Sequence, residues 1–287
     1  MVSRVVAARA VVRLTLAPSV DSVKFTPPLD TNADVYRRRI TVETVSRDAT
    51  RCELQDDFHH FIVVVRHDGT AVVAITAESR RFPWATCPNA ETPLQALIGM
   101  PLSDRFTAAA RYADASQNCT HQFDAAAHAI THIARVVAGG PGPARQYDCE
   151  IAATLANSAA DARRNRLWVD GRLALEWLIR AGRGPVAIDA PFDIAPWRGG
   201  FMRWADATLS AHDAEVAIVL RRACDIGMGR GMDLDAVPEA GRLLHLMSGV
   251  CYTMQPNIAA GSLRNIGTIE DFATQPERLQ HSVGETP

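Results

Sequence analysis

The chain has 287 residues, of which 47% are hydrophobic and 22% charged, and its formal net charge is -2. This composition is typical of a globular protein with one large hydrophobic core or two smaller ones. The near-neutral charge gives no electrostatic reason to expect binding to nucleic acid or to an anionic membrane surface. No apolar stretch reaches the length that a membrane span needs, so we expect no membrane partner.

The six cysteines are scattered along the chain, and no two of them form a CxxC pair. In a chain of this size, such spacing indicates free thiols in a reducing compartment rather than a disulfide framework. Near the N-terminus, Arg9 and Arg13 interrupt an apolar run that would otherwise resemble the core of a signal peptide. We therefore expect a cytoplasmic protein that begins with a loosely ordered arm over residues 1–34.

Residues 35–138 are predicted to form a first unit, an antiparallel meander followed by a long helix. Apolar and polar residues alternate over residues 37–77, and the segment His67–Thr70 supplies a hairpin turn. The pattern then becomes helical, first in two short segments and then in a long Ala-rich run over Thr120–Val137. The Gly/Pro-rich segment 139–146 predicts a linker.

Residues 147–272 are predicted to form a second unit of the same kind, followed by a polar tail over residues 273–287. Its predicted elements are strands over 147–155, 166–170, 172–180 and 185–190, a helix over 201–226 and a last helix over 238–254. Short strings around Trp84 and Trp197 resemble each other. The fold prediction is therefore α+β, with two related units of antiparallel β-meander packed on a long helix (a pseudo-duplication). The alternative is chance similarity of short Ala-rich strings.

Polar residues at the start of the long helix form the first candidate site. On that helix His121, Asp124, His128 and His132 lie in one stripe. For His128 and His132, solvated or singly hydrogen-bonded histidines on a helix face are the ordinary alternative. The helix N-terminus would also favour a thiolate at Cys119, or a bound anion.

The adjacent pairs Asp56-Asp57 and His59-His60 form the second candidate site. On a continuous strand, Asp57 shares a face with His59, and Asp56 shares the other face with His60. A carboxylate beside a histidine fixes the imidazole tautomer for acid–base work, or orients a metal ligand. A polar strand edge is the alternative interpretation.

Cysteines and histidines together raise the question of a metal. His59, Cys87, Cys119 and His121 could make a tetrahedral zinc set, but their spacing is long and unlike that of structural zinc sites. No metal and no other cofactor is therefore favoured, and zinc stays an open alternative. Cys119 as a nucleophile with His121 as its base is a further option, although residues two apart on a helix do not face each other.

Several of these strings resemble a bacterial family filed under domain of unknown function 2889. They are Asp57-Phe58-His59-His60-Phe61, Pro83-Trp84 with Thr86-Cys87-Pro88, Asn118-Cys119-Thr120-His121, and Gly249 to Pro256. The likeness covers roughly residues 36–270, and Gln122 departs from the leucine that is common in the family after Cys-Thr-His. The resemblance implies no activity. It implies only that His59, Cys87, Cys119, His121, Cys251 and Tyr252 lie at motif positions, in proteins that accompany the catabolism of hydrophobic or aromatic compounds.

The function prediction is a small-molecule catabolic enzyme, a lyase or hydrolase acting on a hydrophobic, for example aromatic, substrate. The alternatives are a zinc-dependent hydrolase with a Cys/His site and a non-enzymatic protein that binds a small ligand. We expect a homodimer. The predicted catalytic residues are His59, His121, Asp57, Asp124, Tyr112 and Tyr252. The predicted substrate-binding residues are Trp84, Cys87, Cys119 and Phe123.

Overall fold

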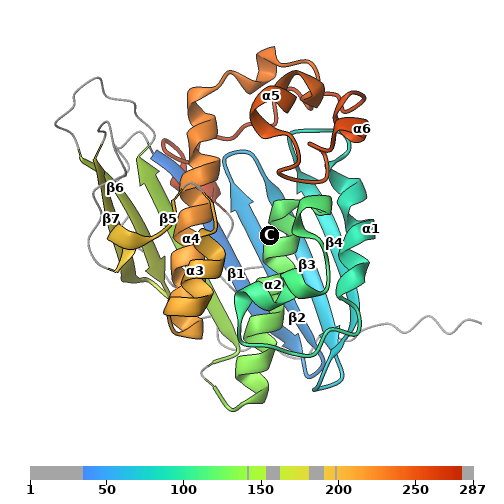
Figure 1. Cartoon of the computed structure of the whole chain (residues 1–287), viewed down its shortest axis with the longest axis vertical. Helices are drawn as coiled ribbons and strands as arrows, with labels where there is room; N and C mark the ends of the chain where they lie inside the picture. The colour runs from blue at the N-terminus through green and yellow to red at the C-terminus, as the bar shows by residue number, and fades with distance from the viewer. Residues whose placement is uncertain (1–34, 141, 153–161, 181–190, 198, 280–287) are drawn as a thin grey trace, which may run out of the picture.

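A computed structural model describes residues 35–140, 142–152, 162–180, 191–197 and 199–279. Seven strands form one antiparallel sheet in the order β4-β3-β2-β1-β5-β6-β7, and helices lie against it (Figure 1). The α+β fold class predicted from the sequence is therefore confirmed. The predicted N-terminal arm, the predicted strand over 185–190 and the end of the predicted tail, 280–287, lie outside the described residues.

The centre of the sheet is the longest strand, which joins the strands of both predicted units. β1 pairs with β2 on one side and with β5 on the other. Its pairing with β5 sets Arg37 opposite Glu150 and Arg39 opposite Asp148. These cross-strand charges form ion pairs of 2.7 and 2.6 Å, which favour this register over a slipped one. The strands are β1 (Val35–Ser46), β2 (Ala49–Asp56), β3 (His60–His67), β4 (Val72–Arg81), β5 (Ala144–Ala152), β6 (Ala162–Val169) and β7 (Arg172–Arg180).

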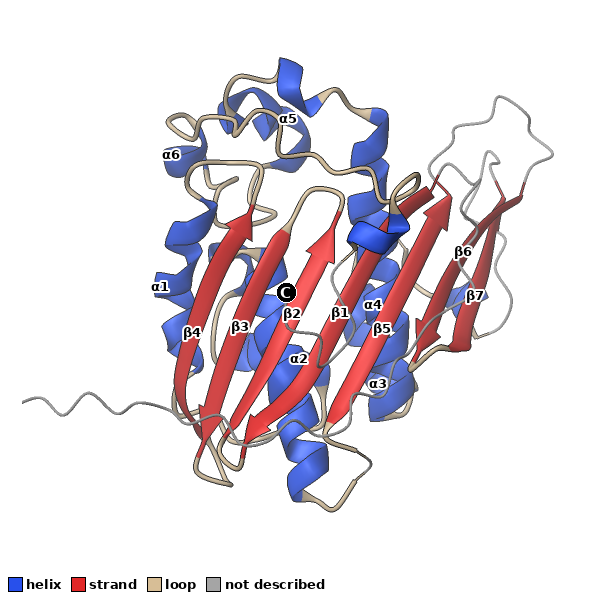
Figure 2. Cartoon of the chain, turned by 180° about the vertical axis from the view of Figure 1, so that it is seen from behind, coloured by secondary structure: helices blue, strands red, loops and turns tan. Residues whose placement is uncertain are grey.

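The longer helices lie on one face of this sheet, and the view from behind shows the strands in front of them (Figure 2). α2 packs mainly on β2 and β3, whereas α4 packs on β5 and β6. The helices are α1 (Glu91–Leu94), α2 (Thr120–Val137), α3 (Phe201–Thr208), α4 (Ala211–Gly227), α5 (Leu244–Met247) and α6 (Pro256–Ala259).

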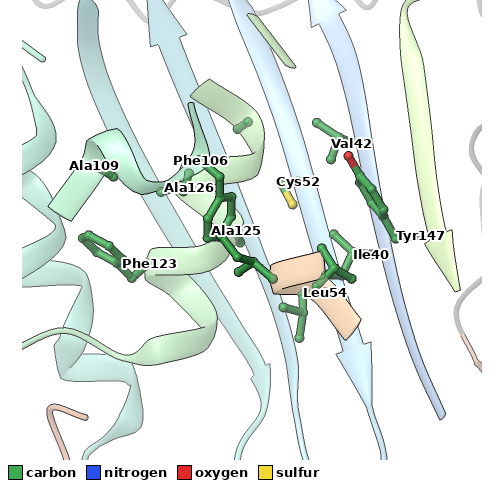
Figure 3. Packing of buried hydrophobic residues seen from close by; sticks show 14 of the residues in the cluster. Ile40, Val42, Cys52, Leu54, Phe106, Ala109, Phe123, Ala125, Ala126 and Tyr147 are labelled. Atoms are coloured by element: carbon green, nitrogen blue, oxygen red, sulfur yellow. The ribbon is translucent and has the colours of Figure 1, made fainter. Parts of the chain in front are cut away.

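The core lies between the sheet and these helices (Figure 3). Every second residue of β1 and β2 enters it, as Ile40, Val42 and Leu54 do. From the other side α2 contributes Phe123 and a run of buried alanines. Because alanine side chains are short, α2 can lie close to the sheet, and side chains at its first turn can reach the strand ends.

Two helix predictions are wrong in the C-terminal half. The predicted helix over 201–226 is two helices, because the chain breaks at Leu209 and restarts at Ser210, whose hydroxyl caps α4 by accepting a hydrogen bond from the Asp213 N–H at 3.1 Å. The predicted last helix over 238–254 contains only a 3₁₀ turn and the four-residue α5. It ends there because Gly249 adopts a left-handed backbone, with φ of 74°.

Two boundaries also need correction. β5 already begins at Ala144, so the predicted linker over 139–146 is shorter than expected. The predicted polar tail is not frayed at its start, because Ala273 and Leu279 are buried and Pro276–Arg278 forms a 3₁₀ turn.

Residues 234–279, here called the C-terminal cap, fold back onto one end of the sheet, where α5 and α6 lie (Figure 1). Backbone hydrogen bonds attach the cap to the first half of the chain. The Ala85 N–H donates to the Leu263 carbonyl at 2.9 Å, and the Glu270 N–H donates to the Asp57 carbonyl at 2.8 Å. The cap therefore closes over the end of the sheet that carries the turn between β2 and β3.

Candidate active site

The turn between β2 and β3 is built around Asp56. β2 ends at Asp56 and β3 begins at His60. Asp56 Oδ1 accepts hydrogen bonds from the backbone N–H groups of Phe58 and His59, each at 2.9 Å, as turn-forming aspartates do. The same oxygen lies 2.9 Å from His59 Nδ1, so the imidazole folds back onto the carboxylate.

The other oxygen of Asp56 is held from β1, where Arg38 lies opposite it in the sheet. Asp56 Oδ2 accepts from the Tyr36 hydroxyl at 2.7 Å and from Arg38 Nε and Nη2 at 3.2 and 3.0 Å. Burial alone would raise the pKa of Asp56, but His59 and Arg38 outweigh it and hold that pKa well below its usual range. Asp56 is therefore a buried, ionised carboxylate in a fixed orientation.

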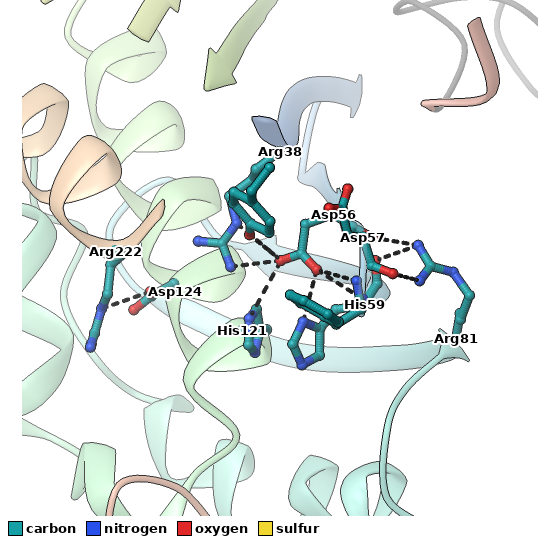
Figure 4. A network of polar contacts seen from close by, with 10 residues as sticks. Arg38, Asp56, Asp57, His59, Arg81, His121, Asp124 and Arg222 are labelled. Atoms are coloured by element: carbon teal, nitrogen blue, oxygen red, sulfur yellow. Dashed lines mark hydrogen bonds and ion pairs between the residues drawn. The ribbon is translucent and has the colours of Figure 1, made fainter. Parts of the chain in front are cut away.

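His121, in the first turn of α2, completes the group (Figure 4). Its ring stacks on that of His59 with centroids 3.6 Å apart, and its Nε2 lies 3.7 Å from Asp56 Oδ2. Burial, together with the neighbouring His59 and Arg38, lowers the pKa of His121 well below its usual value. At neutral pH His121 is therefore an uncharged imidazole.

This arrangement gives His59 the properties of a general base. The nearby carboxylate favours the tautomer with a proton on Nδ1, which leaves a lone pair on Nε2. Nε2 of His59 makes no hydrogen bond to any described residue, and the His59 side chain is 12% exposed beside the fully buried Asp56. The site can therefore take a proton from a bound molecule and stabilise the resulting imidazolium through Asp56.

The strand pattern predicted that Asp57 orients His59, and this prediction is wrong. β2 ends at Asp56, so the alternation of side chains between the two faces of the sheet does not extend to Asp57. Asp57 Oδ2 instead pairs with Arg230 Nη1 at 2.5 Å. Burial raises the pKa of Asp57 to about 7, against the opposing effect of Arg230. His60 points to the other face of the sheet, where its Nε2 lies 2.5 Å from Glu53.

The other residues predicted to be catalytic lie apart from this group. Asp124 pairs with Arg222 of α4 at 3.1 Å (Figure 4). Tyr112 is 48% exposed on the surface. Tyr252 belongs to the C-terminal cap and donates its backbone N–H to the Asn118 carbonyl at 2.9 Å. None of the three has a polar contact with His59 among the described residues.

The residues predicted to bind substrate are also divided. Phe123 packs in the main core. Trp84, Cys87 and Cys119 lie in a second apolar cluster under the C-terminal cap, together with Phe61. Phe61 connects that cluster to the histidines, because its ring centroid is 6.0 Å from those of both His59 and His121.

The cysteines predicted as a nucleophile or as zinc ligands are buried thiols that form no metal-ligand group with the histidines among the described residues. All six are free, and burial raises the pKa of Cys87 to about 12 and that of Cys119 well above its usual value. Both are therefore thiols at neutral pH. Among the described residues, the group with metal-ligand geometry is Asp56, His59 and His121, whose ligand atoms lie within 4.8 Å of one another. The set His59, Cys87, Cys119 and His121 is not assembled.

His128 and His132, further along α2, have partners of their own. His128 Nδ1 lies 2.7 Å from Glu215 Oε1, and His132 Nε2 lies 3.3 Å from the Pro143 carbonyl. Both histidines are buried, so they are neither solvated nor part of the Asp56–His59–His121 group.

Three residues that hold the group in place were not predicted from the sequence: Tyr36, Arg38 and Arg230. One signal was present for Arg38. It occupies the same face of β1 as the apolar residues Ile40 and Val42, and an arginine on such a face requires a buried carboxylate. Arg230 gave no comparable signal, because it lies in a glycine-rich 3₁₀ turn far along the chain.

Comparison with known families supports the resemblance noted in the sequence. Residues 35–135 match the family described as Protein of unknown function (DUF2889). The prediction of this family is confirmed over that segment, which begins with β1 and ends within α2, and therefore contains Asp56, His59 and His121. No curated protein and no solved structure matches the chain. No helix of the described residues is long and apolar enough to cross a membrane.

Proposed function

We propose that the protein is a small-molecule catabolic enzyme, a lyase or hydrolase, in which His59 is the general base. The observation that carries the proposal is the contact of 2.9 Å between His59 Nδ1 and a buried, ionised Asp56. In a hydrolase, His59 Nε2 takes a proton from water. In a lyase, it takes a proton from a carbon atom of the substrate and later returns it to the leaving group.

His121 and Arg38 have supporting roles in this proposal. Arg38 keeps Asp56 ionised and in place, so that the carboxylate stabilises the imidazolium form of His59. His121 remains neutral, so it can offer or accept a hydrogen bond at the substrate without repelling the imidazolium. We assign general-base catalysis to His59 because Asp56 contacts its Nδ1 at 2.9 Å and orients the ring. Asp56 lies 3.7 Å from His121 Nε2 and makes no hydrogen bond to it.

The surroundings of the histidines favour a hydrophobic substrate, for example an aromatic one. Phe58 lies edge-on to His59 with ring centroids 6.1 Å apart, and Phe61 stacks near both histidines. Phe58 and Phe61 are buried, so the surroundings of the histidines are apolar and favour an apolar molecule. The apolar cluster around Trp84 lies beneath the C-terminal cap and includes Phe61.

A second candidate is metal-dependent hydrolysis, because Asp56, His59 and His121 are near enough to share one ion. The hydrogen bonds of Asp56 favour the first candidate. Its two oxygens accept six hydrogen bonds from Tyr36, Arg38, Phe58 and His59, whereas a carboxylate offers about four lone-pair sites. A metal ion at this carboxylate would have to displace some of these donors and lie beside the Arg38 guanidinium.

We further propose that the two halves arose by duplication and that the chain forms a homodimer in the cytoplasm. The order of elements supports a duplication, since β1–β4 precede α2 and β5–β7 precede α3 and α4. A second copy of a strand meander and helix would extend the same sheet, as β5–β7 do beside β1.

Elemental analysis and native mass spectrometry of tag-free protein test these alternatives together. General-base chemistry predicts less than about a tenth of an equivalent of zinc or iron per chain. The proposed homodimer predicts an intact mass of two chains. About one equivalent of metal that is lost in the Asp56→Asn variant would favour metal-dependent hydrolysis. A small molecule that co-purifies with the protein and is released chemically unchanged after long incubation would favour a non-enzymatic binding protein.

A further inference from the structure

A cleft of about 410 Å³ lies on the helical side of the molecule, away from the Asp56–His59 pair. Four segments enclose it: the start of α2, the 3₁₀ segment Phe106–Arg111, α3 and α4. Neither His59 nor His121 lines it. Its volume lies within the range of about 300–1,000 Å³ that is usual for small-molecule sites.

The walls of this cleft are mainly apolar. Phe106 and Phe123 form one part, Met202 another, and alanines of the 3₁₀ segment and of α3 supply the rest. Phe106 and Phe123 are each about 5–6% exposed and are anchored in the main core, so this surface keeps its shape. A rigid apolar cavity of this size suits the hydrocarbon part of a ligand.

The charged groups around the cleft are unevenly paired. Asp124 pairs with Arg222 at 3.1 Å, and Asp206 pairs with Arg105 at 3.5 Å, so both acidic side chains have cationic partners. Arg111 and Arg203 also line the cleft and are exposed at its rim. Among the described residues, neither of these two guanidinium groups has a hydrogen bond or an ion pair. Two unpaired guanidinium groups beside an apolar cavity can bind an anion, because arginine binds carboxylates through paired hydrogen bonds.

We propose that this cleft binds an apolar molecule carrying a carboxylate, with its hydrocarbon part against Phe106, Phe123 and Met202 and its carboxylate at Arg111 and Arg203. This site is separate from the Asp56–His59 pair and does not depend on the chemistry proposed there. The Asp124–Arg222 ion pair also lines the cleft and links α2 to α4.

Calorimetric titration of the full chain with three probes that differ only in their polar end tests this proposal. The probes are 4-phenylbutyrate, 4-phenylbutanol and 4-phenylbutylamine. We expect the acid to bind about tenfold more tightly than the alcohol, and the amine to bind most weakly, since a charged hydrogen bond to arginine is worth about this factor. Equal affinities for the three probes, or no binding of the acid, would overturn the proposal.

Three variants test where the acid binds. The double variant Arg111→Gln and Arg203→Gln is expected to remove the preference for the acid over the alcohol. The matched control Arg242→Gln, at a 72% exposed side chain in the C-terminal cap, should leave that preference unchanged. The His59→Asn variant should also bind the acid normally. If acid binding survives the double variant but is lost in His59→Asn, the ligand occupies the Asp56–His59 pair and the cleft proposal is wrong.

Discussion

Replacing His59 with asparagine is expected to lower the kcat/KM of a general-base reaction by about a hundredfold to ten-thousandfold. Asparagine keeps a polar side chain beside Asp56, but it cannot take a proton at neutral pH. Two small apolar probes separate the reaction classes. 5-Nitrobenzisoxazole opens when a base removes a proton from carbon, as in a lyase, and 4-nitrophenyl butyrate reports hydrolysis.

Two further histidine variants make this result specific. His245→Asn changes an exposed histidine of the C-terminal cap, and it should retain the wild-type rate. His121→Asn removes the ring stacked on His59 at 3.6 Å, and it should give a smaller loss than His59→Asn because Asp56 still orients the base. If His59→Asn is as active as His245→Asn on both probes, His59 is not the general base.

Replacing Asp56 with asparagine is expected to lower the free energy of unfolding by about 3–5 kcal/mol at neutral pH, the usual cost of removing one partner from a buried ion pair. Asparagine is nearly the same size as aspartate, so the loss reports charge and hydrogen bonding rather than a cavity. The change leaves Arg38 buried without its counter-charge and takes an acceptor away from Tyr36. Urea unfolding of both proteins measures the difference.

The pH dependence of this difference has a defined sign. The pKa of Asp56 is lowered on folding, so its contribution is fully present above the unfolded value of about 4 and is lost as the pH falls through the lower folded value. The difference in the free energy of unfolding between wild type and Asp56→Asn should therefore be largest near neutral pH and smaller in acid. The control variant Asp104→Asn, at an exposed aspartate, should have the same free energy of unfolding as wild type at each pH. A difference between wild type and Asp56→Asn that is the same at pH 3 and pH 7 would contradict an ionised Asp56.

The elements with strong local patterns could be predicted from the sequence. The bounds of α2, Thr120–Val137, and of β7, Arg172–Arg180, agree with the pattern, because an Ala-rich run and an alternating run each extend over the whole element. The sequence also singled out His59 and His121 as predicted catalytic residues, and the two rings are stacked. The short turns of the C-terminal cap were missed, because contacts with residues 82–90 and 118, rather than periodicity, shape that segment.

The choice between Asp56 and Asp57 could not be made from periodicity. The alternating pattern continues to Phe61, but Asp56 ends β2 by accepting two backbone N–H groups of the turn, so alternation no longer describes residues 57–59. Arg38 on β1 decides which carboxylate is buried beside His59, through a strand pairing that only the folded sheet reveals. Such long-range contacts cannot be predicted from the sequence of residues 56–59 itself.

The most direct test of the Asp56–His59 pair is the tautomer of His59, read from ¹⁵N chemical shifts of histidine-labelled protein at pH 7. For the neutral form of His59 we predict a proton on Nδ1 and an unprotonated Nε2, with this tautomer preference lost in Asp56→Asn. A His59 that carries its proton on Nε2 at this pH would have no lone pair to offer a substrate there, and it would contradict the proposed general base.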